Sequence, residues 1–400
     1  VTVAAGSGTP VVFDTANSDS MAAAFDSDSG KVVIAYNGGS GYGTAIVGTV
    51  SGTSISYGTP VVFQSNTTDN ISATFDSDSN KVVIAYRSRP GSDEGAAIVG
   101  TVSGTAISFG TKVQFENNSC RYTSTVFDSA SNKVVIGYRG SSNHGRAIVG
   151  TVSGTAISFG TAVVFEAAAT AFCACSFDTN NNAVAIAYQD VGNSDHGTAI
   201  VGTVSGTAIS FGSAVVFESA AVAEISATFD TAANRVVISY QDQGNSFYGT
   251  AIVGSISGTV ITFGGSAVVF EAANSSSTSA VFDTAVGKVV ISYQDNGNTG
   301  DGTLVLGTVS GYGISFDAAV VVSTGNCFYL TSVYDSTNST VVIAYSDNAN
   351  SDDGTAVVYK NASSNMTASN LLGIASGAIL DTATGTINTW GSRNEVQTSL

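Results

Sequence analysis

The chain is poor in charge, histidine and long apolar runs, and each shortage excludes a class of protein. Only 11% of its 400 residues are charged, and the net charge is −17. Such an acidic chain lacks the basic face that neutralises phosphates, which argues against general nucleic-acid binding. No apolar run approaches the roughly 20 residues that a membrane-spanning helix needs. We therefore expect no nucleic-acid partner and no membrane insertion.

Cysteine is sparse, with Cys120, Cys173, Cys175 and Cys327 as its only copies. Cys173 and Cys175 stand two apart on a predicted strand, so they point the same way and are poorly placed to bond each other. We expect buried free thiols, with a Cys120–Cys173 bridge between adjacent repeats as the open alternative. The chain has two histidines and no Cys-x-x-Cys motif. We therefore predict no metal site, and no cofactor motif is found.

The chain consists largely of tandem repeats. The segment Gly197–Phe211 reads GTAIVGTVSGTAISF, and the rest of the chain is organised between its copies. Near copies stand at Gly43–Tyr57, Gly95–Phe109, Gly145–Phe159 and Gly249–Phe263, with a looser copy at Gly302–Phe316. An anchor aromatic followed by Asp recurs at Phe25, Phe75, Phe127, Phe177, Phe229, Phe282 and Tyr334. The spacing defines seven units of about fifty residues.

Each unit carries several short β signals and no helical period. Lys81–Tyr86 (KVVIAY) is rich in β-branched and aromatic residues, which fit a pleated surface. Ser103-Gly-Thr105 separates two such runs and predicts a tight hairpin. Four strands per unit at this period predict an all-β, seven-bladed β-propeller of four-stranded blades over residues 1–360. A linear β-solenoid is the alternative architecture.

The two ends of the repeat region predict how the ring closes. The seventh unit ends its third strand at Ala356–Tyr359 and has no fourth. The segment Val1–Gly6 precedes Gly8–Phe13, where a fourth strand falls in the other units, so the N-terminal strand should complete the last blade and leave no long open edge. The Phe-Asp strand should be innermost. Residues 361–400 should form a linker and a short C-terminal β tail that serves as an attachment module.

Comparison of the chain with itself separates a constant face from a variable one. The Ser-Gly-Thr turns barely change, whereas the loops on the opposite face differ in every unit. The variable crossover loops are Gln64–Asn70, Glu116–Tyr122, Glu166–Phe172 and Ser323–Tyr329. A constant scaffold under one variable face is typical of a binding surface. The alternative is that unconstrained loops have drifted.

Positive charge gathers on the variable face of the second and third units. The candidate ligand-binding residues are Arg87, Arg89, Arg121, Tyr122, Arg139, His144 and Arg146. Arginine forks suit carboxylate, sulfate or phosphate groups, and tyrosine offers a face to a sugar ring. The hypothesis is a cell-surface glycan or other anionic surface ligand at this site. Local charge balance against Asp93, Glu94 and Glu116 is the alternative.

The GTAIVGTVSGT repeat and the segment Leu371–Leu400 resemble tandem repeats and short modules in virion and tail-fibre proteins of marine bacteriophages and in surface proteins of marine microbes. The resemblance implies a fibre, spike or adhesion role at an extracellular or virion surface, with other virion or appendage subunits bound through the C-terminal tail. It supplies no site residues. We therefore predict a non-enzymatic adhesion or receptor-binding protein. A purely structural subunit is the alternative, and a glycan-cleaving enzyme is a third, weaker class because no nucleophile–base pair stands out.

Overall fold

The computed structural model describes residues 5–89, 93–362, 374–375 and 387–388. Over these residues the chain forms antiparallel β-strands joined by turns, with short 3-10 turns as its helical elements. Contacts divide the chain into a unit of Ser7–Lys360 and a second unit of Val1–Gly6 with Asn361–Leu400. Most of the predicted tail lies outside the described residues; within it, β32 (Ile374–Ala375) pairs with β33 (Ile387–Asn388). None of the described helices has the length and apolarity to cross a membrane.

The fourth repeat shows the sheet that each repeat builds. Its innermost strand is the second half of β16 (Val163–Asp178), followed by β17 (Ala183–Asp190), β18 (His196–Ser205) and β19 (Ala208–Phe211), each antiparallel to the last. The turn between β18 and β19 places Gly206 at φ +62°, a conformation that glycine adopts without steric cost. The equivalent β9–β10 turn pairs Ser103 with Ala106, which confirms the predicted hairpin.

The other repeats follow the same order. The innermost strands are β3 (Asp19–Asp26), β7 (Val61–Asp76), β12 (Arg121–Asp128), β20 (Val215–Asp230), β24 (Val268–Asp283) and β29 (Cys327–Asp335). The second strands are β4 (Lys31–Asn37), β8 (Lys81–Ser88), β13 (Lys133–Arg139), β21 (Arg235–Asp242), β25 (Lys288–Asp295) and β30 (Thr340–Asp347). The third strands are β5 (Tyr42–Ser51), β9 (Glu94–Ser103), β14 (His144–Ser153), β22 (Tyr248–Ser257), β26 (Asp301–Ser310) and β31 (Asp353–Lys360).

Short strands lie at the outer edges, and 3-10 turns follow several second strands. The edge strands are β2 (Val11–Asn17), β6 (Ser54–Tyr57), β10 (Ala106–Phe109), β11 (Val113–Glu116), β15 (Ala156–Phe159), β23 (Val260–Phe263), β27 (Gly313–Phe316) and β28 (Val320–Ser323). The described strands begin with β1 (Gly6–Ser7). The 3-10 turns are η1 (Ser141–Asn143), η2 (Val191–Asn193), η3 (Gln243–Asn245), η4 (Asn296–Asn298) and η5 (Asn348–Asn350).

The crossovers between successive sheets differ in part from the prediction. The strands β7, β16, β20 and β24 each run for 16 residues. The first half of β16 pairs with β14 and the second half with β17. The prediction of loops at Gln64–Asn70 and Glu166–Phe172 was therefore wrong, because continuous strands satisfy their backbone groups on two neighbouring sheets. Glu116–Tyr122 and Ser323–Tyr329 do contain breaks between strands, as predicted.

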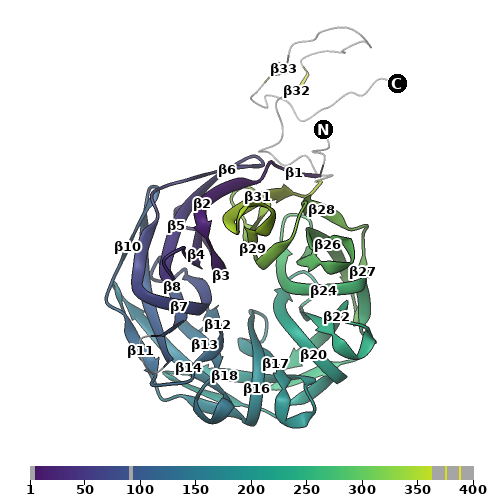
Figure 1. Ribbon diagram of the computed structural model, residues 1–400. Coiled ribbons are helices and arrows are strands. Elements are labelled where there is room, and N and C mark those ends of the chain that lie inside the picture. Colours follow the sequence, from purple (N-terminus) through teal and green to yellow (C-terminus); the bar gives the residue numbers. More distant parts are fainter. Residues whose placement is uncertain (1–4, 90–92, 363–373, 376–386, 389–400) are drawn as a thin grey trace. The chain divides into compact units, whose positions relative to one another are not determined.

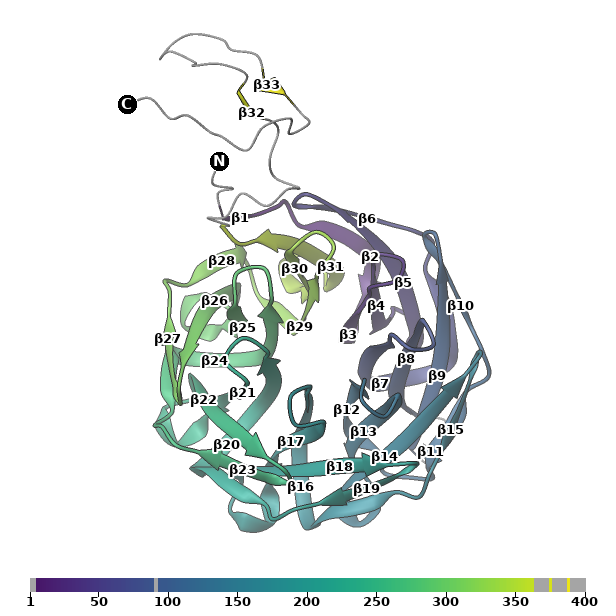
Figure 2. The same ribbon diagram turned by 180° about the vertical axis from the view of Figure 1, so that it is seen from behind.

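The innermost strands of the Ser7–Lys360 unit face a common centre (Figure 1), which is also seen from behind (Figure 2). A cavity of about 520 Å³ at this centre is lined by residues of β3, β7, β12, β20, β24 and β29. The innermost position predicted for the Phe-Asp strand is confirmed.

A strand from the start of the chain lies beside the last repeat. Val11 of β2 pairs with Ala356 of β31, and the Gly8 N–H donates to the Val358 carbonyl at 2.8 Å. The sequence predicts that Val1–Gly6 supplies the fourth strand of the last repeat at this edge. Residues 1–4 of that segment lie outside the described residues.

Aromatic side chains connect most sheets to the next. Phe165, from the strand that leaves the third repeat, lies 5.2 Å from Tyr188 and 5.8 Å from Phe211 between ring centroids. Tyr188 is fully buried. Equivalent contacts pair Phe13 with Tyr36, Phe63 with Tyr86, Phe115 with Tyr138, Phe217 with Tyr240 and Phe270 with Tyr293. An aromatic contact thus recurs at six junctions between sheets. In the last repeat Val322 stands at the phenylalanine position, and the Tyr345 hydroxyl donates to Ser323 Oγ at 2.8 Å instead.

All four cysteines are free, as predicted, and the alternative Cys120–Cys173 bridge is not formed. Cys120, Cys173 and Cys327 are buried. Burial raises the pKa of Cys175 and of Cys327 to about 11, so both stay protonated thiols at neutral pH.

The aromatic contact between sheets predicts a large loss of stability when it is removed. Phe165→Ala should lower the free energy of unfolding by about 3–5 kcal/mol, because it opens a cavity between two sheets. Val164→Ala is the matched control on the same strand, where the side chain is 42% exposed, and should cost less than about 1 kcal/mol. Chemical denaturation followed by circular dichroism measures both, and equal losses would contradict the assigned contact.

Candidate functional site

Arg87 of β8, the first candidate residue, is buried, with 2% of its side chain exposed. Its Nε and Nη2 donate to the two carboxylate oxygens of Asp69, with Nη2–Oδ2 at 2.5 Å, and its Nη1 lies 3.5 Å from Asp93 Oδ2. In later repeats the same strand position holds Gln189 and Gln241, whose amides donate to backbone carbonyls of the next sheet. Arg87 thus occupies a position where the other repeats connect neighbouring sheets.

Arg89 contacts the same carboxylate from the solvent side. Its Nη2 forms an ion pair with Asp69 Oδ2, while 48% of its side chain is exposed. Burial alone would raise the pKa of Asp69, but hydrogen bonds from Arg87 and Asn70 and the charges of both arginines lower it below its usual range. Asp69 therefore stays ionised and fixes the position of the exposed Arg89 guanidinium.

Arg121 and Arg146 also have carboxylate partners, and Arg121 shares Asp93 with Arg87. The Arg121 Nη2 lies 3.6 Å from Asp93 Oδ2, and the Arg146 Nη1 lies 3.6 Å from Glu116 Oε2. These separations are longer than a good charge-assisted hydrogen bond, so the pairs are weak. The pairing nevertheless fits the charge-balance alternative, in which Asp93 and Glu116 offset nearby arginines.

Arg139 of β13 contacts an aromatic pair instead of a carboxylate. Its Cζ lies 5.0 Å from the centre of the Tyr122 ring, and that ring lies 5.0 Å from Phe172. Its Nη1 donates to the Thr170 carbonyl at 3.4 Å. Burial lowers the pKa of Arg139, and the neighbouring Arg121 lowers it further. Within the described part of the chain, Arg139 forms no ion pair, so its charge is stabilised mainly by the tyrosine face.

His144, the last candidate, begins β14 and pairs in register with Ala169. Its carbonyl accepts a hydrogen bond from the Gly140 N–H at 2.9 Å. The structure thus divides the seven candidates into small groups. Arg87 and Arg89 meet at Asp69, Tyr122 and Arg139 contact each other, and Arg146 pairs with Glu116.

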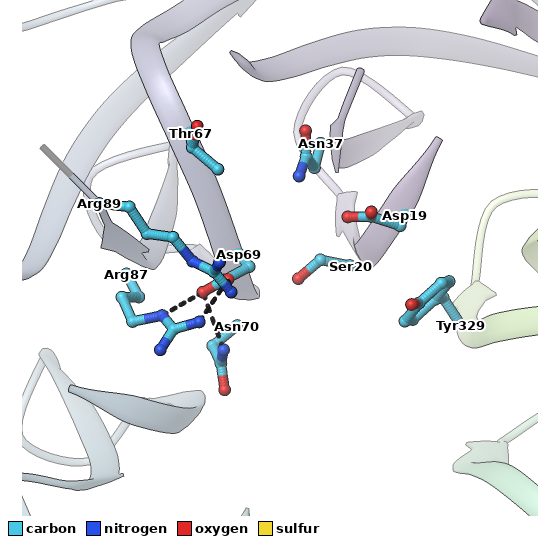
Figure 3. Close-up of a pocket in the computed structure, with 9 residues that line it drawn as sticks. All are labelled: Asp19, Ser20, Asn37, Thr67, Asp69, Asn70, Arg87, Arg89 and Tyr329. Atoms are coloured by element: carbon cyan, nitrogen blue, oxygen red, sulfur yellow. Dashed lines mark hydrogen bonds and ion pairs between the residues drawn. The ribbon is translucent and has the colours of Figure 1, made fainter. Parts of the chain in front are cut away.

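A pocket of about 490 Å³ opens beside Asp69 and Arg89 (Figure 3). Tyr329 of β29 lies across the pocket from Arg89, and Asp19 of β3 lies between them. Asn37, Thr67, Asn70, Ser20 and Arg87 complete the lining. The Tyr329 side chain is 51% exposed. The pocket thus offers an aromatic face, hydroxyls, amides and charges of both signs to one ligand.

Of the nine lining residues, the sequence candidates include Arg87 and Arg89 alone, and the most important of the others are Asp19, Asp69 and Tyr329. Asp69 and Tyr329 do fall inside the variable segments Gln64–Asn70 and Ser323–Tyr329, so variation between repeats was the available signal. Their approach to one another depends on how distant repeats meet, which no local pattern indicates. Burial raises the pKa of Asp19, although a hydrogen bond with Asn37 opposes the shift.

A second hollow of about 210 Å³ lies nearer the centre and includes Glu224 of β20. Glu224 Oε2 accepts a hydrogen bond from the Ser277 N–H at 3.2 Å. Burial raises the pKa of Glu224, and this hydrogen bond opposes part of the increase. This hollow therefore contains a carboxyl group whose pKa is raised by burial.

Comparison with known proteins establishes the fold class. No protein-family model matches the chain, and no curated protein sequence matches it. The crystal structure of the BP39L lectin from Burkholderia pseudomallei matches with a TM-score of 0.65 at 12% sequence identity, over 88% of this chain and 98% of the lectin chain. At this identity the likeness concerns the fold alone. The protein therefore has an all-β, propeller-like fold of antiparallel sheets.

The raised pKa of Glu224 predicts a pH-dependent effect of its removal. Between its unfolded and folded pKa values the folded chain binds more protons, so stability falls as pH rises through that interval. Glu224→Gln keeps an acceptor for the Ser277 N–H and removes the ionisation. The variant should gain stability relative to the wild-type chain between about pH 4 and about pH 7. Denaturation midpoints at both pH values test this, and a constant difference would contradict it.

Proposed function

We propose that the protein is a non-enzymatic glycan-binding protein displayed on a virion or cell surface. In this proposal its repeats are the seven blades of a β-propeller, and the N-terminal strand closes the ring. The observation that carries the proposal is the fold shared with a lectin over nearly the whole lectin chain. The pocket on the variable side of the repeats supports a binding role on that side.

The pocket chemistry supports a saccharide as the ligand. Sugar rings present hydroxyls around their edge and C–H groups on their faces, so they need donors, acceptors and an aromatic surface. Arg89 and Asn70 supply donors, Asp19 supplies acceptors, and Tyr329 supplies the aromatic face. The volume of about 490 Å³ falls within the roughly 300–1,000 Å³ common for small-molecule pockets.

The state of the carboxylates supports binding rather than cleavage. Glycoside hydrolysis usually needs two carboxyl groups that exchange protons with the substrate and water. Asp69 already accepts hydrogen bonds from Arg87 and Asn70 and forms an ion pair with Arg89. This leaves Asp19 as the carboxyl group in the pocket with freedom to act.

We propose further that residues 361–400 attach the repeat unit to other virion or appendage subunits. The resemblance of the repeats and the tail to marine phage fibre proteins supports this placement. In that arrangement the repeat unit recognises the cell surface, and the tail holds it on the particle.

The proposal predicts that the full chain binds immobilised glycans. An array of neutral, sialylated and sulfated glycans with lipopolysaccharides should give reproducible hits at about 50 mM and about 500 mM salt. A loss of binding at high salt would favour the arginine groups, because ionic contacts are screened. Arg121→Ser, at an exposed arginine, should weaken only such salt-sensitive hits.

Two results would overturn the proposed function. Binding to no glycan would favour the purely structural subunit. Shortened oligosaccharides after incubation, detected by mass spectrometry, would favour a glycan-cleaving enzyme.

A further inference from the structure

One backbone position has the same unusual conformation in every repeat. It lies five residues before the anchor aromatic, where the innermost strand shifts register against the second strand. The residues are Ser20, Asn70, Tyr122, Phe172, Glu224, Ser277 and Tyr329, with φ of 48°, 47°, 52°, 49°, 50°, 50° and 51°. This left-handed region is unfavourable for residues that carry a Cβ.

Glycine would adopt this conformation at no steric cost, yet none of the seven positions holds it. In its constant Ser-Gly-Thr turns the chain does place glycine, and Gly52, Gly104 and Gly206 have φ of 64°, 63° and 62°. The turns after the innermost strands more often hold asparagine, a small polar residue that tolerates this region, whereas the innermost bulges also hold tyrosine and phenylalanine. At these bulges of the innermost strands the chain therefore carries a side chain, although the backbone conformation is unfavourable for any residue with a Cβ. Such strain, found repeatedly in one place, points to a role for the side chains.

Part of that role is structural. Ser20 Oγ accepts from the Ile71 N–H at 3.3 Å, and Asn70 Oδ1 accepts from the Tyr122 N–H at 2.6 Å. Glu224 Oε2 likewise accepts a hydrogen bond from the Ser277 N–H of the next repeat. Tyr329 differs, because its hydroxyl forms no hydrogen bond within the described residues and half of its side chain is exposed. Its ring lies 6.5 Å from that of the adjacent Phe328 between centroids, and this contact leaves the hydroxyl and half of the side chain open to solvent.

The pocket lies where Ser20, one of the two serines at this position, stands between two larger side chains. Ser20 leaves space between Tyr329 on one side and Asn70 on the other, and all three line the pocket. Figure 3 shows Arg89 and Asp69 on the wall that faces Tyr329. The small side chain of Ser20 thus leaves room for the pocket between Tyr329 and Asn70.

Formal charges around this pocket cancel. The lining contains two carboxyl groups, Asp19 and Asp69, and two guanidinium groups, Arg87 and Arg89. Both guanidinium groups already contact Asp69. An anionic ligand would therefore gain little net attraction and would approach Asp19. An uncharged ligand with hydroxyl groups meets no such cost.

We propose that this pocket binds an uncharged sugar residue of a glycan, with the sugar face on Tyr329 and its hydroxyls toward Arg89 and Asp19. The inference rests on the proposed glycan-binding function and names the site and the ligand class. Asp69 acts as a positioning residue, because it holds Arg89 across from the tyrosine.

Titration calorimetry of the full chain with the tightest-binding neutral oligosaccharide from a glycan array tests the proposal. Tyr329→Ala should weaken binding about tenfold or more, since loss of an aromatic anchor removes much of a small ligand's affinity. Tyr329→Phe should stay within about threefold, because the ring face rather than the hydroxyl makes the contact. Binding should change less than about twofold between about 50 mM and about 500 mM salt.

Phe172→Ala is the matched control, because it changes an aromatic residue at the same backbone position outside the pocket. It should leave the affinity unchanged. Thr67→Trp provides a second test, since it fills the exposed rim of the pocket without removing a contact of the fold, and it should abolish binding. Unchanged denaturation midpoints exclude unfolding as the cause of any loss.

The outcomes separate the two proposals. Neutral-glycan binding that survives both Tyr329→Ala and Thr67→Trp overturns this site and leaves the glycan-binding function standing. Hits restricted to anionic glycans, with strong salt dependence, overturn the ligand class and favour the arginine groups. Binding of no glycan by the wild-type chain overturns both.

Discussion

The fold depends on one aromatic contact that recurs at six junctions between successive sheets. The ring of Phe165 occupies the space between its own strand and the buried Tyr188 of the next sheet. Gly145 faces that ring, and a Cβ there would lie 2.4 Å from a ring carbon, so only glycine permits the approach. Repeats that share this constraint cannot vary at these positions. Variation is therefore confined to positions outside the contact, where a change of side chain leaves the sheets in place.

The innermost bulge is such a position, and it connects the scaffold to the proposed function. Its backbone conformation is constant, whereas its side chain ranges from Ser20 to Tyr329. A fixed backbone with an exchangeable side chain can change what a central pocket recognises without a change in the sheets. Stability and recognition thus depend on different positions of the same repeat.

Much of the sheet architecture could be predicted from the sequence because it is set by local patterns repeated many times. The anchor at Phe177, the Gly206 turn and the strand after Asp178 all follow from composition and spacing. The candidate site could be predicted only in part. Variation between repeats indicated the variable face, and clustered positive charge indicated the arginines. The burial of Arg87 against Asp69, however, depends on how two neighbouring strands pack. The approach of Tyr329 to Arg89 depends on contact between the last repeat and the first two, for which no local signal exists.

The central claim is that the pocket between Tyr329 and Arg89 binds an uncharged sugar. A crystal structure of the full chain with the tightest-binding neutral oligosaccharide tests it most directly. The account predicts a sugar ring stacked on Tyr329, with hydroxyls within hydrogen-bond distance of Arg89 and Asp19. A sugar bound on the constant face of the Ser-Gly-Thr turns, or at Arg121 and Arg146 with the pocket empty, would contradict it.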